Sequence, residues 1–173
     1  LLKSFEEDFA IVDLDNDPEI EMLEPRGKAN IYDAIKVGLR DYFEKNGFKK
    51  ACLGMSGGID SAVVLAMAVE VLGAENVRIL MMPSQFSSEH SVTDSIEMAE
   101  KLGVEYDVIP ISATYHTVVD SMKPVIGGTR FDVTEENIQS RIRCMMLMAL
   151  SNKYGHIILN TSNKSEAAMG YGT

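Results

Sequence analysis

Short apolar runs alternate with helical patterns along most of this chain, and this alternation limits the possible folds more than any other feature of the sequence. Runs of strand length occur at 50–55, 77–82, 105–109 and 156–161. Helical patterns stand before or between them, at 27–46, 61–72, 88–102, 112–122 and 135–154. Strands that are separated by helices pair in parallel, with helices on both faces of the sheet. The sequence therefore predicts an α/β fold with a parallel sheet covered on both faces.

Charge is distributed unevenly along the chain. The 173 residues carry a net charge of −10, but residues 1–24 hold nine acids and one base, and residues 25–173 are nearly balanced. Proteins that bind nucleic acid through its phosphates usually have a basic face, so we expect no nucleic-acid partner. One phosphorylated small molecule needs only a local site and is not excluded. We interpret residues 1–26 as an acidic linker or arm, in which 9–14 is a candidate short strand.

Cysteine usage and hydropathy bear on where the protein works. Cys52 and Cys144 both lie in apolar runs, and we expect both to be reduced thiols in the core, which suits a cytoplasmic protein. No apolar run approaches the roughly 18–20 residues that a membrane span needs. The chain begins without Met and stops at Met-Gly-Tyr-Gly-Thr, so we expect a fragment of a longer protein.

A glycine-rich string, Gly54-Met-Ser-Gly-Gly-Ile-Asp-Ser61, joins the first predicted strand to the next helix. Adjacent glycines let the backbone turn tightly and aim N–H groups into one cavity, and the helix N-terminus adds partial positive charge. Ser56 and Ser61 add hydroxyl donors. Such a loop is a phosphate cradle, although it lacks the Lys of a Walker A motif. The alternative is a simple turn in which Asp60 or Ser61 caps the helix.

Two further polar segments follow later in the chain. In 134–143, Asn137 and Arg141 share one helix face, and Ile138, Ile142, Met146 and Ala149 form a packing face. The alternative for Arg141 and Arg143 is a solvated basic turn or pairing with the preceding acids. In 159–166, a strand leads directly into a loop that carries Thr161 and Glu166. Its alternative interpretation is a helix cap rich in Ser and Asn.

Both carboxylates of these loops suit a metal ion. Asp60 would repel a bound phosphate unless Mg²⁺ lay between the two. Parallel strands end at the same edge of a sheet, where ligands bind, so Glu166 is expected beside the cradle. Asp60 and Glu166 together could hold one Mg²⁺ against phosphate oxygens.

The cradle resembles the signature of the PP-loop ATP pyrophosphatases, which cleave ATP between its α and β phosphates. The strings at 132–143 and 161–166 follow it in the order and spacing of one member family, NAD synthetase. The resemblance runs from about Gly27 to the end of the chain and implies a Rossmann-like, adenine nucleotide alpha hydrolase-like fold. It places the NAD synthetase ATP-pyrophosphatase domain at 27–173.

The resemblance also implies roles for individual residues. It assigns ATP to the cradle and to one residue near the end of the chain, namely Gly54, Met55, Ser56, Gly57, Gly58, Ile59, Asp60, Ser61 and Thr161. It assigns Mg²⁺ to Asp60 and Glu166. It assigns the substrate deamido-NAD to Arg141, with Asn137 on the same face. Gln85 or Ser87 is expected near the nucleotide.

The implied activity is that of a ligase in NAD biosynthesis. The nicotinate carboxylate of deamido-NAD attacks the α-phosphorus of ATP and releases pyrophosphate, and ammonia then displaces AMP. No side chain acts as a nucleophile, and His90, His116 and His156 receive no role. Two alternatives stay open: another PP-loop amidotransferase such as GMP synthetase, and a nucleotide-binding module without turnover.

The sequences of segments 161–166 and 82–90 resemble the glutamine-dependent branch of the family more closely. In that branch an amidase domain precedes the synthetase, so 1–26 would be its tail or the linker. The family also associates through its synthetase domains, which implies a homodimer or larger. It continues past the equivalent of Thr173, so we expect a domain that is incomplete at its C-terminal end and holds half of a site.

Overall fold

The computed structural model describes residues 2–13, 15 and 27–172, and the chain divides into two compact units, 1–46 and 47–173. In the first unit, α1 (Lys28–Asn46) forms as the sequence predicts. Its apolar residues are unevenly covered, since Phe43 is buried whereas Ile31 and Ile35 are exposed. The division into a linker and a synthetase domain at residue 26 stays a prediction.

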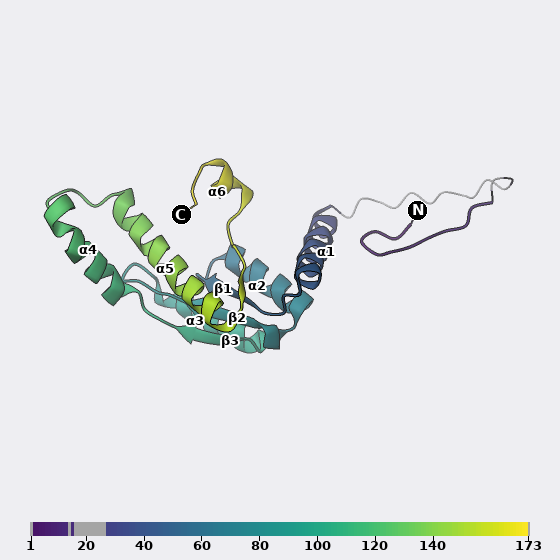
Figure 1. Cartoon of the computed structure of the whole chain (residues 1–173), viewed down its shortest axis with the longest axis horizontal. Coiled ribbons are helices and arrows are strands. Elements are labelled where there is room, and N and C mark those ends of the chain that lie inside the picture. Colours follow the sequence, from purple (N-terminus) through teal and green to yellow (C-terminus); the bar gives the residue numbers. More distant parts are fainter. Residues whose placement is uncertain (1, 14, 16–26, 173) are drawn as a thin grey trace. The chain divides into compact units, whose positions relative to one another are not determined.

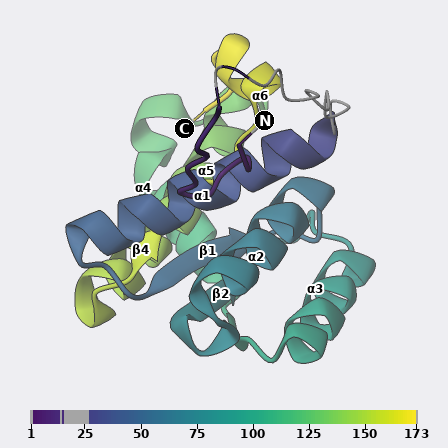
Figure 2. The ribbon, with the colours of Figure 1, turned by 90° about the vertical axis from the view of Figure 1, so that its right-hand side faces the viewer.

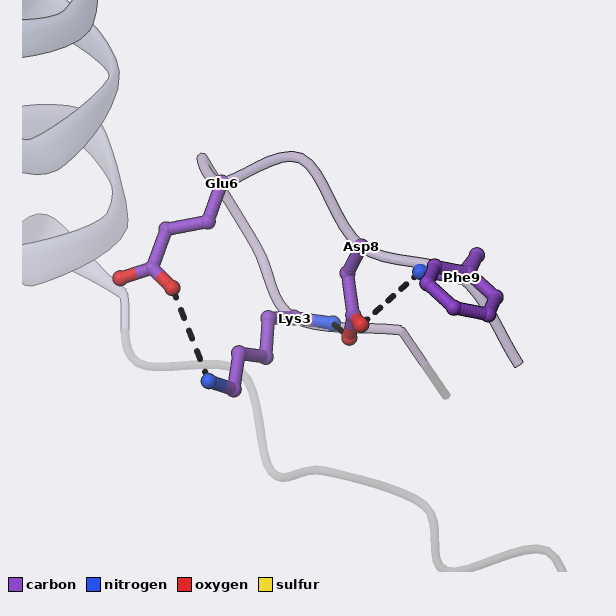
Figure 3. Close-up of polar contacts among 4 residues, drawn as sticks. All are labelled: Lys3, Glu6, Asp8 and Phe9. Carbon is purple, nitrogen blue, oxygen red and sulfur yellow. Dashed lines mark hydrogen bonds and ion pairs between the residues drawn. The ribbon is translucent and has the colours of Figure 1, made fainter.

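The acidic N-terminal segment forms local polar contacts instead of the candidate strand. The Lys3 ammonium lies 3.7 Å from Glu6, and the Lys3 and Phe9 N–H groups donate to the carboxylate of Asp8 at 3.0 and 2.9 Å (Figure 3). Residues 9–13 have no regular secondary structure, so the strand prediction is wrong there, and Leu14 lies outside the described residues. Acidic side chains that bond their own backbone compete with strand pairing.

The second unit alternates strands and helices in the predicted order (Figure 1). Its elements are β1 (Ala51–Met55), α2 (Ile59–Leu72), the 3₁₀ turn η1 (Ala74–Asn76), β2 (Val77–Met81), α3 (Glu89–Leu102), β3 (Glu105–Val108), α4 (Ser112–Ile126), α5 (Val133–Tyr154), β4 (Ile157–Ile158) and α6 (Lys164–Ala168). The predicted α/β class is confirmed. The short helix α6 was not predicted as an element, although a helix cap was the alternative interpretation of its segment.

The described strands form a parallel sheet in the order β3-β2-β1-β4. Ala51 of β1 pairs with Val77 of β2 on one side and with Ile157 of β4 on the other. The fourth strand is much shorter than the predicted 156–161. After Leu159, whose N–H donates to the Cys52 carbonyl at 2.9 Å, the Asn160 side chain accepts from the Ser162 N–H and turns the chain away from β1.

Each face of the sheet has its own apolar core, as the alternation of side chains along β2 requires. Ile79 and Met81 face α2 and α3, which lie side by side in Figure 2, whereas Leu80 faces α4 and α5. The predicted packing face of α5 is confirmed except at its last position. Ala149 is exposed, and Leu147 and Leu150 pack in its place.

No helix within the described part of the chain is long and apolar enough to cross a membrane.

Candidate functional site

The site lies where the order of the strands reverses. The chain passes from β1 outward to β2 and β3, and then returns to place β4 on the other side of β1. Ligands of open α/β sheets bind at such a switch point, beyond the carboxyl ends of the strands. The loops that follow β1 and β4 are the two loops that the sequence predicted to hold ATP and Mg²⁺.

The loop after β1 needs glycine for two independent reasons. Gly57 has φ +80°, a left-handed conformation that L side chains rarely adopt, and a Cβ there would lie 2.6 Å from the Ser91 carbonyl oxygen of α3. Gly58 then provides the N-cap position of α2 without any side-chain cap. The alternative in which Asp60 or Ser61 caps the helix is therefore wrong.

Hydroxyl groups inside this loop fix its shape. The buried Ser61 hydroxyl donates to the Gly58 carbonyl at 3.0 Å and lies 3.2 Å from the Ser56 hydroxyl. Ser56 itself is exposed at the mouth of the loop. Ser61 thus holds the turn together, while Ser56 and the backbone of the helix start are accessible to a ligand.

A cavity of about 570 Å³ opens beside the loop. Among the predicted ATP residues, Gly54, Met55, Ser56 and Thr161 line it, whereas Gly57, Gly58, Ile59, Asp60 and Ser61 do not. Its other lining residues include hydroxyls that the sequence did not single out, from Ser91, Ser95 and Ser140, together with Ser87, which was expected near the nucleotide. Gln85 is exposed and lies outside the described lining.

Arg143 is the one charged side chain among the described residues that line this cavity. It is half-buried, and its Nε donates to the Met82 carbonyl at 3.1 Å, at the carboxyl end of β2. Burial lowers the pKa of its guanidinium. The acid-paired alternative is wrong for Arg143, because no described side chain forms an ion pair with it, although the preceding acid Glu136 lines the second cavity beside it. Its half-burial and its bond to Met82 also differ from a freely solvated turn.

Arg141 and Asn137, the predicted deamido-NAD residues, lie elsewhere on α5. Arg141 is exposed, Asn137 is half-buried, and neither lines a described cavity. Helix residues two positions apart point in different directions, so Arg141 and Arg143 cannot both face the sheet. Their predicted contact with substrate is not tested by this structure.

A second cavity of about 430 Å³ adjoins the first and shares Ser87, Ser140 and Arg143 with it. The Phe86 and Phe131 rings, in an edge-to-face pair with centroids 5.9 Å apart, line its wall. Arg143 thus stands at the junction of two spaces that a pair of ligands could occupy.

Asp60 and Glu166 both accept hydrogen bonds from one residue, Asn163. The Asn163 side chain donates to the Asp60 carboxylate at 3.4 Å, and the Asn163 N–H donates to Glu166 at 3.1 Å. Asn163 also caps α6, accepting from the Glu166 N–H at 2.9 Å, so the helix-cap interpretation of this segment is confirmed. Carboxylate oxygens are the ligands that Mg²⁺ prefers, and these two lie in the first turns of α2 and α6, at the switch point, so they fit such an ion.

The two cysteines differ, contrary to the sequence prediction. Cys52 is fully buried in β1, and burial raises the pKa of its thiol to about 11. Cys144 is exposed and lines the larger cavity, so its assignment to the core is wrong. The apolar residues around it in the sequence belong to other faces of α5.

Residues 31–173 match the family model described as NAD synthase. The chain belongs to the NAD synthase family. This confirms the membership that the sequence motifs predicted, and it does not favour the GMP synthetase alternative. The two segments that carry the motifs, the glycine loop and 159–166, both line the larger cavity.

Members of the NAD synthase family with known names and structures resemble this chain closely. A glutamine-dependent NAD(+) synthetase from Aquifex aeolicus is 50% identical over 149 residues, which cover 86% of this chain and 26% of that protein. The structure of a glutamine-dependent NAD+ synthetase from Acinetobacter baumannii in complex with ADP is 42% identical, with a TM-score of 0.84 over 91% of this chain and 30% of that one.

An NH3-dependent NAD synthetase from Campylobacter jejuni is more distant, at 30% identity and a TM-score of 0.74 over 84% of this chain and 61% of that one. The chain thus spans about a quarter of the length of the Aquifex relative.

Proposed function

We propose that the intact protein makes NAD by amidating deamido-NAD at the expense of ATP. The nicotinate carboxylate attacks the α-phosphorus of ATP, which forms an adenylate and releases pyrophosphate. Ammonia then attacks the activated carbonyl carbon, and AMP leaves. The observation that carries this proposal is the convergence of the glycine loop after β1 and the 159–166 segment on one hydroxyl-lined cavity, in a chain of the NAD synthase family.

The residues of this chain would bind and orient the reactants. The N–H groups at the start of α2, the Ser56 hydroxyl and Thr161 receive the nucleotide, and the wider cradle from Gly54 to Ser61 shapes its phosphate site. Arg141 and Asn137 bind deamido-NAD. The chemistry needs no nucleophilic side chain, because fixed donors and charges that hold two anions in position lower the barrier.

Asp60 and Glu166 would hold Mg²⁺, with Asn163 fixing their orientation. When bound, the ion neutralises charge on the phosphate oxygens. The support for ATP as the nucleotide is the relative of this fold that was solved with ADP.

Glutamine is the proposed source of the ammonia, released by an amidase domain that precedes this chain in the intact protein. The support is that the glutamine-dependent relatives from Aquifex and Acinetobacter, at 50% and 42% identity, resemble this chain more than the NH3-dependent one does, at 30%. We further propose a homodimer or larger assembly in the cytoplasm. Light scattering on the intact protein would contradict the assembly if the protein were monomeric at working concentration.

Mass spectrometry of the products tests the function. Intact protein with ATP, Mg²⁺ and deamido-NAD should form AMP and NAD in equal amounts with either ammonia or glutamine. Activity with ammonia alone would reject the glutaminase proposal and keep the synthetase. AMP without NAD would reject NAD synthesis and point to another acceptor, and the absence of any ATP turnover would point to a binding module.

A further inference from the structure

Arg143 has no role in the proposed reaction, although it lies between the two cavities. It lines both cavities, and among the residues that the structure describes only Ser87 and Ser140 do the same. Its Nε is bonded to the carbonyl of Met82, which is 61 residues away in the sequence. One edge of the guanidinium is therefore fixed to the sheet, and its two terminal nitrogens are the donors that remain for a ligand.

The charge of Arg143 is not paired with a carboxylate in the part of the chain that the structure describes. Arg78 shows how this fold neutralises a half-buried arginine, because Asp107 lies 2.8 Å and Glu105 3.2 Å from its guanidinium. Among the described side chains no carboxylate forms an ion pair with Arg143, although Glu136 lines the smaller cavity with it. The larger cavity is otherwise lined by hydroxyl, amide and apolar groups, with no acid among its described lining residues. A cation that loses hydration without gaining a partner is costly, and an anionic ligand removes that cost.

We propose that Arg143 is a substrate-binding residue whose guanidinium contacts the phosphate oxygens of a nucleoside polyphosphate in the larger cavity. The planar fork of arginine suits two phosphate oxygens at once. Its anchor on Met82 holds it at the carboxyl end of β2, beside the strand from which the glycine loop leaves. The identity of the ligand as ATP rests on the proposed function, but the contact itself requires only a polyphosphate.

Equilibrium binding of ATP and of AMP to the intact protein tests this contact, with Arg143→Met and Arg143→Lys as variants. Lys153→Met, at an exposed cation in the last turn of α5, is the control. Arg143→Met should weaken ATP binding by about tenfold to a hundredfold, the range for a charge-assisted hydrogen bond. AMP, which lacks the β and γ phosphates, should lose less. Arg143→Lys keeps the charge but not the planar fork, so its loss of affinity should be intermediate. Lys153→Met should bind ATP as the wild type does, because Lys153 lines neither cavity.

Two results would overturn the proposal. One is unchanged ATP affinity in Arg143→Met. The other is an equal loss for ATP and AMP, which would indicate a distorted cavity instead of a lost phosphate contact. If Arg143→Met does not fold, the ATP-to-AMP difference in Arg143→Lys decides in the same way. The two proposals can fail separately. If Arg143→Met loses ATP affinity as expected but the wild-type protein forms no NAD, the proposed function is rejected and the phosphate contact is supported.

Discussion

Two half-buried arginines, one at each end of the parallel sheet, have opposite electrostatic surroundings. At the amino ends of the strands, Arg78 of β2 is enclosed by Asp107 and Glu105 of β3, and its guanidinium lies 5.7 Å from the Tyr154 ring. At the carboxyl ends, Arg143 meets a backbone carbonyl and a set of hydroxyls. The partners of Arg78 raise its pKa, whereas burial lowers the pKa of Arg143.

This difference separates stability from function. An arginine whose charge is satisfied within the fold stabilises the fold, and its loss leaves carboxylates without partners. An arginine that is left without a counterion is maintained for something that binds. We therefore expect substitutions at the amino ends of the strands to change the free energy of unfolding. Substitutions at the carboxyl ends should change the turnover of ATP instead.

The largest effect on turnover is expected from Asp60→Asn. Asp60 is exposed in the first turn of α2, so its loss should leave the urea midpoint unchanged, but removing a Mg²⁺ ligand should lower kcat/KM by about 100-fold or more. Asp94→Asn, an exposed acid on α3, is the matched control and should keep wild-type activity. Intact ATP turnover in Asp60→Asn would reject the metal assignment.

Arg78→Met should have the opposite profile. Asp107 and Glu105 would lose their cation, and we expect the free energy of unfolding to fall by about 1–3 kcal/mol with kcat/KM for ATP unchanged. Lys101→Met removes an exposed pair with Glu97 and should change stability little. A stable Arg78→Met protein with poor turnover would break the comparison between the two ends.

Asn163→Ser separates capping from metal positioning at the carboxyl end. Serine keeps an acceptor for the Glu166 N–H but loses the amide that reaches Asp60. We expect the Mg²⁺ concentration for half-maximal rate to rise about tenfold, the usual effect of losing a group that orients metal ligands. An unchanged Mg²⁺ requirement would show that Asn163 serves α6 alone.

The smallest effect concerns pH and His156, which is buried at the amino end with its Nδ1 unpaired among the described residues. Burial lowers its pKa, Lys50 and Arg78 lower it further, and Glu105 acts in the opposite sense. Below the ordinary pKa near 6.5, the unfolded chain binds more protons, so the stability contributed by neutral His156 falls as pH decreases.

Urea unfolding of wild type and His156→Gln at pH 7.5 and 5.5 measures this loss. The wild type should lose more unfolding free energy than the variant between these two pH values. The difference should be smaller than about 1.4 kcal/mol per pH unit, which is the value for uptake of one full proton. His116→Gln, at an exposed position, should behave as the wild type does. An equal pH response in all three proteins would contradict the assignment.

Local patterns were enough to predict the order of the elements and the glycine loop. A buried strand, two glycines and a helix define that loop over eight neighbouring residues, and the conformation of Gly57 follows from the same string. Asp60 and Glu166 could be placed at one edge because parallel strands end together. These inferences depend on sequence order and on the rules of parallel sheets.

What the sequence could not show depends on contacts between distant segments. Arg141 and Arg143 are the same residue type two positions apart, and the sequence does not show which of them faces the cavity. Packing of α5 on the sheet places Arg143 there, where its Nε donates to the Met82 carbonyl. Cys144 lies in an apolar run of the sequence, yet it is exposed and lines the larger cavity. The Met and Leu residues around Cys144 in the sequence do not indicate that a cavity lies beside it.

A crystal structure of the intact protein with Mg²⁺ and a non-hydrolysable ATP analogue tests the central claim most directly. We expect the triphosphate between the glycine loop and Arg143, with a metal ion on Asp60 and Glu166 and with Arg78 still paired to Asp107. Phosphates bound away from the loop, or Arg143 turned toward an internal carboxylate while the nucleotide is bound, would contradict it.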